Sequence, residues 1–253
     1  MKVISYNLFE GAKDTRSDLI DFIGNEMPNV VCLQETNGWD ENEQATANEF
    51  ANAVDMPFFV CGASNTRFKL ATFSRTPFAN SQIFTRGFWH GVIRTSIAHR
   101  SGSIDMFNLH LNPGLESIRL EEAAILVSAA KGLHNAIFMG DFNSLSKNDA
   151  YDKGLLELLR AKGIKKFGEV ALQFDVIDYF TEHGFVDLAD ALGTRETTVP
   201  TPANNDKYHA DELRLDYIFA NPELVPRVTS ADVVKNNLTD RISDHYPLVM
   251  TIR

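Results

Sequence analysis

Short runs of apolar and β-branched residues alternate along the chain with longer segments in which apolar residues recur at helical spacing. The short runs predict strands at residues 2–6, 29–33, 57–61, 69–74, 78–84, 91–98, 103–111, 136–139, 214–219 and 246–252, and a weaker one at 230–234. The longer segments predict helices at residues 15–25, 42–54, 116–131, 150–161 and 173–183. This mixture indicates an α/β fold in which helices cover sheets.

One long polar stretch, residues 194–212, interrupts this pattern and predicts no regular element. It could be a linker between two domains. Strand runs lie on both sides of it, so we interpret it instead as a functional loop on one body. No other feature marks a boundary, and we expect residues 1–253 to form a single domain.

The overall composition excludes some classes of protein. The 253 residues are 44% hydrophobic, which is typical of a globular chain, and carry a formal net charge of −10. No apolar run reaches the roughly 18 residues needed to cross a membrane. The acidic balance argues against nucleic-acid binding through a broad basic surface, but it leaves room for a nuclease whose bound cation supplies local positive charge.

The two cysteines, Cys32 and Cys61, lie in apolar strand-like runs without zinc-type spacing. We interpret them as unpaired core thiols, which favours a reducing compartment. The first residues lead directly into a strand and show no signal peptide, so we expect a cytoplasmic protein. No obligate protein partner is inferred.

Polar and acidic side chains recur where the strand runs end. The residues concerned are Asn7, Glu35, His110, Asp141, Asn143, Asp216, Asp244 and His245. Buried strands end at shared sheet edges, so such side chains can converge although they are far apart in sequence. Asp141 and Asn143 would also face the same side if the chain stays extended between them.

Six short motifs contain these residues and occur in a fixed order between residues 5 and 248. They are Ser5-Tyr6-Asn7, Leu33-Gln34-Glu35-Thr36, Asn108-Leu109-His110-Leu111, Gly140-Asp141-Phe142-Asn143-Ser144, Arg214-Leu215-Asp216-Tyr217-Ile218-Phe219 and Ser243-Asp244-His245-Tyr246-Pro247-Leu248. The ordered set resembles the endonuclease/exonuclease/phosphatase superfamily of DNase I-like and exonuclease III-like metallohydrolases. This resemblance implies a four-layer α/β sandwich, with two mixed sheets packed face to face and helices outside.

The resemblance also implies a metal site. Glu35 and Asp244 would bind Mg²⁺ or Mn²⁺, and Asn7 would add a neutral amide oxygen. Carboxylate oxygens suit these hard cations, which keep waters for a substrate phosphate. Read alone, Glu35 could be a surface acid and Asn7 a turn residue.

The remaining roles concern catalysis. By resemblance, Asp141 aligns or deprotonates the attacking water, and Asn143 orients that water or holds a phosphate oxygen. His245 would contact the phosphate as a base or as an electrostatic stabiliser, and His110 would donate to a phosphate oxygen or to the leaving group. Asp216 would hydrogen-bond His245 and fix its tautomer. Each has a structural alternative: an Asx-turn for Asp141, a pairing with Arg214 for Asp216, and a core histidine for His110. Two further histidines have less specific interpretations. His90 could stack with Trp89 against a base, but we favour a hairpin residue; His209 could line the site, but we favour a solvated loop residue.

The motifs identify phosphate-ester hydrolysis but not the ester. We expect a nuclease or phosphodiesterase that acts on nucleic acid; a hydrolase of small phosphorylated metabolites or lipid headgroups is the alternative. A catalytically dead binding protein is disfavoured because every motif position is filled. Asn37 after Thr36, and Tyr208-His209 before Asp216, depart from the exonuclease III-like pattern and weaken an abasic-site assignment. Possible phosphate contacts are Arg67, Lys69, Arg75, Arg86, Arg94, Lys147, Arg214 and Arg241.

Overall fold

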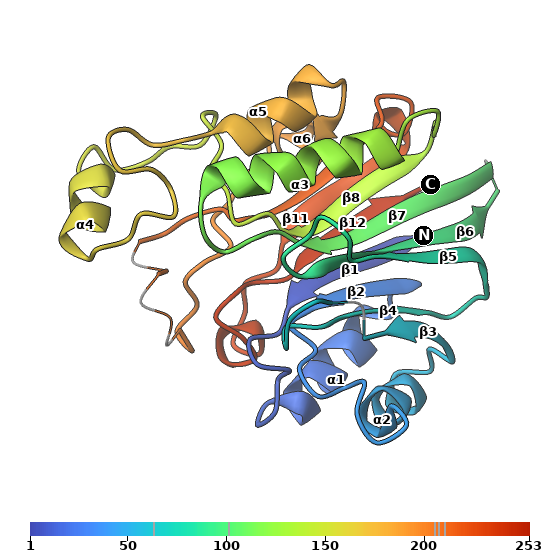
Figure 1. Cartoon of the computed structure of the whole chain (residues 1–253). Helices are drawn as coiled ribbons and strands as arrows, with labels where there is room; N and C mark the ends of the chain where they lie inside the picture. The colour runs from blue at the N-terminus through green and yellow to red at the C-terminus, as the bar shows by residue number, and fades with distance from the viewer. Residues whose placement is uncertain (63, 101, 205, 207, 210) are drawn as a thin grey trace.

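The computed structural model describes residues 1–62, 64–100, 102–204, 206, 208–209 and 211–253. Within them the strands form two six-stranded sheets (Figure 1). The first sheet has the order β11 (Val228–Val233), β12 (Leu248–Ile252), β1 (Lys2–Asn7), β2 (Val30–Gln34), β4 (Leu70–Ser74) and β3 (Phe58–Cys61). The second has the order β5 (Phe78–Phe84), β6 (Gly91–His99), β7 (Gly102–His110), β8 (Ala136–Asp141), β10 (Asp216–Ala220) and β9 (Val186–Asp187).

Helices cover both outer faces of this pair of sheets (Figure 1). On the first sheet lie α1 (Arg16–Glu26) and α2 (Ala45–Ala53); on the second lie α3 (Glu116–Ala129) and α5 (Asp175–Glu182). The short α6 (Leu188–Leu192) contacts β10 of one sheet and β11 of the other. A further helix, α4 (Leu155–Ala161), stands apart at one end. Two 3₁₀ turns, Val225–Arg227 and Thr239–Arg241, flank β11. The predicted four-layer α/β sandwich is confirmed.

Side-chain alternation along the central strands explains why their sequences read as continuous apolar runs. In β8, Ile137 and Met139 pack between the two sheets, whereas Phe138 packs against α3 and α5. In β2, Cys32 lies between the sheets and Leu33 faces α1 and α2. Both faces of each strand are therefore buried, and this buried apolar area is the main stabilising contribution.

Most predicted elements agree with the structure to within two residues at each end. The helix expected at 42–54 begins only at Ala45, because Asn42, Glu43 and Gln44 adopt left-handed backbone angles. The helix expected at 150–161 begins at Leu155. The prediction missed β9 and α6, which are too short to show a periodic pattern.

Strand register brings the predicted site residues to one edge. β1 and β2 run parallel, as do β7 and β8, so their carboxyl ends meet there. In the second sheet, Asp141 pairs with His110 on one side and with Asp216 on the other. Gly140 makes this close approach possible: at its φ of 140°, a Cβ would stand 1.9 Å from the carbonyl oxygen of Leu109.

Candidate active site

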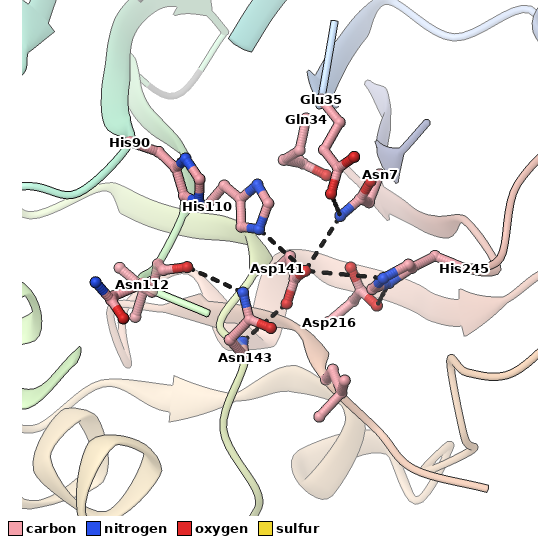
Figure 2. Close-up of polar contacts among 12 residues, drawn as sticks. Asn7, Gln34, Glu35, His90, His110, Asn112, Asp141, Asn143, Asp216 and His245 are labelled. Carbon is pink, nitrogen blue, oxygen red and sulfur yellow. Dashed lines mark hydrogen bonds and ion pairs between the residues drawn. The ribbon is translucent and has the colours of Figure 1, made fainter. Parts of the chain in front are cut away.

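The carboxylate of Asp141 is the centre of the site (Figure 2). Its Oδ2 accepts a hydrogen bond of 3.1 Å from Asn7 Nδ2. The same oxygen lies 3.4 Å from His110 Nε2 and 3.8 Å from His245 Nε2. Burial alone would raise the pKa of Asp141, but His110, His245 and Lys166 outweigh it and lower this pKa to about 2. Asp141 is therefore ionised at neutral pH.

Asn143 lies beside Asp141 for a different reason from the one expected. The chain does not stay extended: Asn143 has a φ of 54°, and its N–H donates to Asp141 Oδ1 at 2.8 Å. This is the Asx-turn that was the structural alternative for Asp141, and it holds the Asp141 carboxylate in place at the centre of the site. The Asn143 side chain donates to the carbonyl oxygen of Leu111 at 2.9 Å.

His245 and Asp216 form a buried pair, with 2.7 Å between Nδ1 and Oδ2. Burial disfavours the charged imidazole, but Asp216, Asp141 and Asp244 more than offset it and raise the pKa of His245 to about 10. The alternative pairing of Asp216 with Arg214 does not occur, because Arg214 binds Asp149 and Asp187.

His110 and His90 stack on each other with ring centroids 4.3 Å apart and lie beside Asp141 (Figure 2). Burial lowers the pKa of His110 to about 4, so its ring is neutral at pH 7. His90 is also buried and lines the same cavity, with Nδ1 2.7 Å from Thr66 Oγ1. His90 lies in the connection between the antiparallel strands β5 and β6, as the hairpin interpretation expected, and it also lines the cavity.

The proposed metal ligands lie at the same edge. Glu35 accepts from the Glu10 N–H at 3.1 Å, and burial raises its pKa to about 7, with Asp244 and Asp141 adding to the effect. Asn7 faces these carboxylates with its amide nitrogen, 3.4 Å from Glu35 Oε1, while its oxygen accepts from the Phe9 N–H. In this orientation the Asn7 amide nitrogen positions the carboxylates, and the amide oxygen is turned away from the proposed metal ligands.

His209 is the main surprise of the loop at 194–212. It is buried, and its Nδ1 lies 3.3 Å from Asp244 Oδ2, so the solvated-loop interpretation is wrong. Burial opposes ionisation of Asp244, but His209 and His245 hold the pKa of Asp244 below its usual range. Donor atoms of His209, Asp244 and His245 lie within 4.8 Å of one another.

Described parts of this loop also support the strand ends. Thr198 Oγ1 accepts from the N–H of Asp216 at 3.2 Å, and the N–H of Thr201 donates to the carbonyl oxygen of Asp244. These contacts attach the described parts of the loop to Asp216, at the start of β10, and to Asp244.

A cavity of about 490 Å³ opens onto Asp141, and sequence reasoning missed part of its lining. Lys166 is buried there, and exposed apolar side chains such as Trp89 and Leu115 border it. Lys166 lies in the segment between α4 and α5, outside all six motifs. No periodic or motif signal could have indicated it.

Buried charges on α3 hold the cavity walls. Arg119 donates to Glu116 Oε2 at 2.8 Å and to the carbonyl oxygens of Asn112, Gly114 and Lys166. Glu116 also accepts from Ser144 Oγ, next to Asn143. A fully bonded buried ion pair of this kind fixes the geometry of the segments that it joins.

Comparison with known proteins identifies the family. The sequence model described as "Endonuclease/Exonuclease/phosphatase family" matches residues 4–245. The chain therefore belongs to that family. A search of the curated proteins finds no match.

Several solved structures share the fold. An AP endonuclease from Archaeoglobus fulgidus is 19% identical with a TM-score of 0.74, and the alignment covers 100% of this chain and 99% of that one. A variant of the Neisseria 3′ phosphatase NExo, bound to a product DNA hairpin, is 14% identical with a TM-score of 0.73 and the same coverage. A humanized D. rerio TDP2 is 20% identical with a TM-score of 0.66, covering 100% and 98%.

Family membership defines the activity at a coarse level. The chain is a phosphoesterase of a family that depends on divalent metals. No helix in the described part of the chain is long and apolar enough to cross a bilayer.

Proposed function

We propose that this protein hydrolyses phosphodiester bonds of nucleic acids by in-line attack of water, with Mg²⁺ or Mn²⁺ as cofactor. The observation that carries the proposal is the crowding of Asn7, His110 and His245 around a single oxygen of Asp141. A buried, ionised carboxylate surrounded by donors is suited to orient a water molecule.

The protein's own residues supply the proton movements. Asp141 accepts the proton of the attacking water as the new P–O bond forms and the bond to the leaving oxygen breaks. His245, held as an imidazolium by Asp216, offsets negative charge on the phosphoryl oxygens. His110, neutral at pH 7, offers a ring N–H to the same oxygens or to the leaving group.

Glu35 and Asp244 are the residues that would hold the cation. Two observations fit this assignment: the pKa of Glu35 is raised by burial and by neighbouring carboxylates, and His209 Nδ1 is buried without a hydrogen-bond partner among the described residues. A bound divalent cation would relieve both conditions and would neutralise charge on the leaving oxygen. Asn7 would join as a ligand only with its amide turned over.

The surface cations favour a second candidate, a hydrolase of small phosphate esters. Most of the lysines and arginines expected to contact a phosphate backbone are paired with acids of the chain. The pairs are Arg67–Glu10, Lys69–Asp40, Arg75–Asp55, Arg94–Asp105, Lys147–Asp178, Arg214–Asp149 and Arg241–Asp18. A polymer that needs several phosphate contacts would have to displace these partners.

The deciding experiment incubates the protein and its Asp141→Asn variant with Mg²⁺ or Mn²⁺. End-labelled single-stranded, duplex and abasic DNA and RNA form one arm, and phosphate release from a panel of small esters forms the other. We expect metal-dependent hydrolysis that falls by about 10³-fold or more in the variant. Near-native turnover by a folded Asp141→Asn protein would show that the reaction centre lies elsewhere.

A further inference from the structure

An apolar wall borders the cavity beside Asp141. It consists of Trp89, Leu115 and Ile118, and it contains some of the most exposed large apolar side chains among the described residues. Trp89 keeps 55% and Leu115 51% of their surface in contact with solvent. Exposed apolar side chains gathered at a reaction centre indicate that the substrate covers them.

The apolar wall is held firmly by buried charges. Glu122, on α3, accepts from the N–H of Trp89 at 2.6 Å and from the N–H of Asn112 at 2.7 Å. Gly87, two residues before Trp89, packs on the same helix so closely that a Cβ would stand 2.5 Å from Ile125 Cδ1. The two loops that carry Trp89 and Leu115 are thus fixed to one helix and form a preorganised surface.

Lys166 gives the same cavity a positive charge, which favours an anionic ligand. Its side chain is buried at the cavity, and its ammonium forms no hydrogen bond or ion pair with any residue that the structure describes; it lies 5.2 Å from the Phe167 ring centroid. Its carbonyl oxygen accepts from Arg119 Nη2 at 2.6 Å, which fixes the backbone from which the side chain reaches the cavity. An ammonium without a bonded acid at a buried position favours an anionic partner.

Size and charge then restrict the substrate. A cavity of about 490 Å³ holds a group the size of one nucleotide, and Lys166 is the single lysine or arginine among its described lining residues. We propose that Lys166 binds one phosphoryl group while the apolar wall stacks against a flat apolar group of the same ester. The substrate is therefore a phosphate ester of nucleotide size, either free or at a strand end. This inference rests on the proposed function, since it names the substrate of the same site.

Tryptophan fluorescence can test the binding step separately from turnover. The chain has two tryptophans, and Trp39 is fully buried, so a ligand in the cavity should quench only the exposed Trp89. The test uses the Asp141→Asn protein with Mg²⁺, titrated with thymidine 5′-monophosphate, thymidine, glycerol 3-phosphate and inorganic phosphate. We expect thymidine 5′-monophosphate to quench and to bind more tightly than either half of it alone.

Two variants in this background, measured by calorimetry, separate the two contacts. Lys166→Gln should lower the affinity for thymidine 5′-monophosphate at least about tenfold and leave the affinity for thymidine unchanged. Trp89→Ala should lower the affinity for the same nucleotide about tenfold and leave the affinity for glycerol 3-phosphate unchanged. Lys131→Gln and Ile83→Ala remove an exposed lysine and an exposed apolar side chain elsewhere, and should change neither affinity.

The source of the ester is decided by competition. A 5′-phosphorylated oligonucleotide that displaces the nucleotide supports a strand end, and failure to displace it supports a free small ester. An unchanged affinity of the Lys166→Gln protein for thymidine 5′-monophosphate would overturn the proposal, as would the absence of quenching. If hydrolysis that depends on Asp141 persists without quenching, the proposed function stands and this subsite does not. Quenching without hydrolysis by the wild type would instead support the subsite and contradict the proposed function.

Discussion

Gln34 Nε2 donates a hydrogen bond of 2.8 Å to Asn108 Oδ1 and so joins β2 of the first sheet to β7 of the second. Asn108 continues the connection by donating to the carbonyl oxygens of Leu33 and Ala71 and to Thr72 Oγ1. Both residues are fully buried between apolar layers. Glu35 and His110 lie one and two residues further along the chain, so this polar bridge sets the distance between the two halves of the site.

The first prediction concerns this bridge. Asn108→Ala should lower the free energy of unfolding by about 2–4 kcal/mol, because it leaves buried acceptors on the first sheet without donors. Urea denaturation of Gln34→Ala, Asn108→Ala and the double variant would measure the coupling, which we expect to be roughly 1 kcal/mol. Strictly additive effects would mean that the two side chains do not stabilise each other.

The second prediction concerns pH. Burial lowers the pKa of His245, but Asp216 outweighs it and raises this pKa to about 10 in the folded protein. The ion pair with Asp216 therefore stabilises the folded state as long as the imidazole is protonated. In EDTA, the stability lost in Asp216→Asn should be full at the ordinary histidine pKa of about 6.5 and should shrink as the pH rises from there towards 10. Unfolding curves across this range, with the NMR titration of His245, would check it. A loss that grows with pH would contradict the assignment.

The third prediction concerns the ion pair on α3. Arg119→Ala leaves Glu116 as an uncompensated buried charge and should cost about 3–5 kcal/mol of stability, measured by denaturant unfolding. Arg241→Ala is the matched control, because Arg241 pairs with Asp18 in solvent and its removal should leave the unfolding midpoint almost unchanged. Similar losses in the two variants would show that Arg119 does not hold the cavity walls.

The fourth prediction concerns the cation. An imidazole beside Asp244 adds a nitrogen donor that suits transition metals better than Mg²⁺. His209→Asn should therefore lower the affinity for Mn²⁺ roughly tenfold and change the affinity for Mg²⁺ little. Electron paramagnetic resonance of free Mn²⁺ gives the first value, and competition by Mg²⁺ gives the second. His134→Asn, which changes a histidine outside the cavity lining, serves as the control.

Sequence reasoning predicted that the candidate site residues converge, because these residues sit at strand ends, and the structure brings them to one edge. Strand register places Asp141 between His110 and Asp216, and this pairing is known only from the structure. Short continuous apolar runs predicted nearly every strand, since both faces of the central strands are buried. Local patterns therefore predicted the elements, whereas the four-layer arrangement came from the family resemblance of the motifs.

Other features depended on tertiary contacts that no local pattern encodes. His209 is buried because its loop folds back onto Asp244, and a polar, proline-containing sequence predicts the opposite. Lys166 reaches the cavity from a segment between two helices, and His90 stacks on His110 from the connection that precedes β6. The chain turns at Asn143, where the prediction assumed an extended backbone. Asparagine adopts the left-handed conformation readily, and its N–H donates to Asp141 Oδ1.

The division of the candidate site between two sheets has a consequence for when during folding activity can arise. Asn7 and Glu35 come from one sheet and Asp141 from the other, so neither sheet carries a complete reaction centre. A chain whose two sheets have not docked lacks this arrangement of side chains. We therefore expect hydrolysis only from fully folded molecules, so that activity reports the docking of the two sheets.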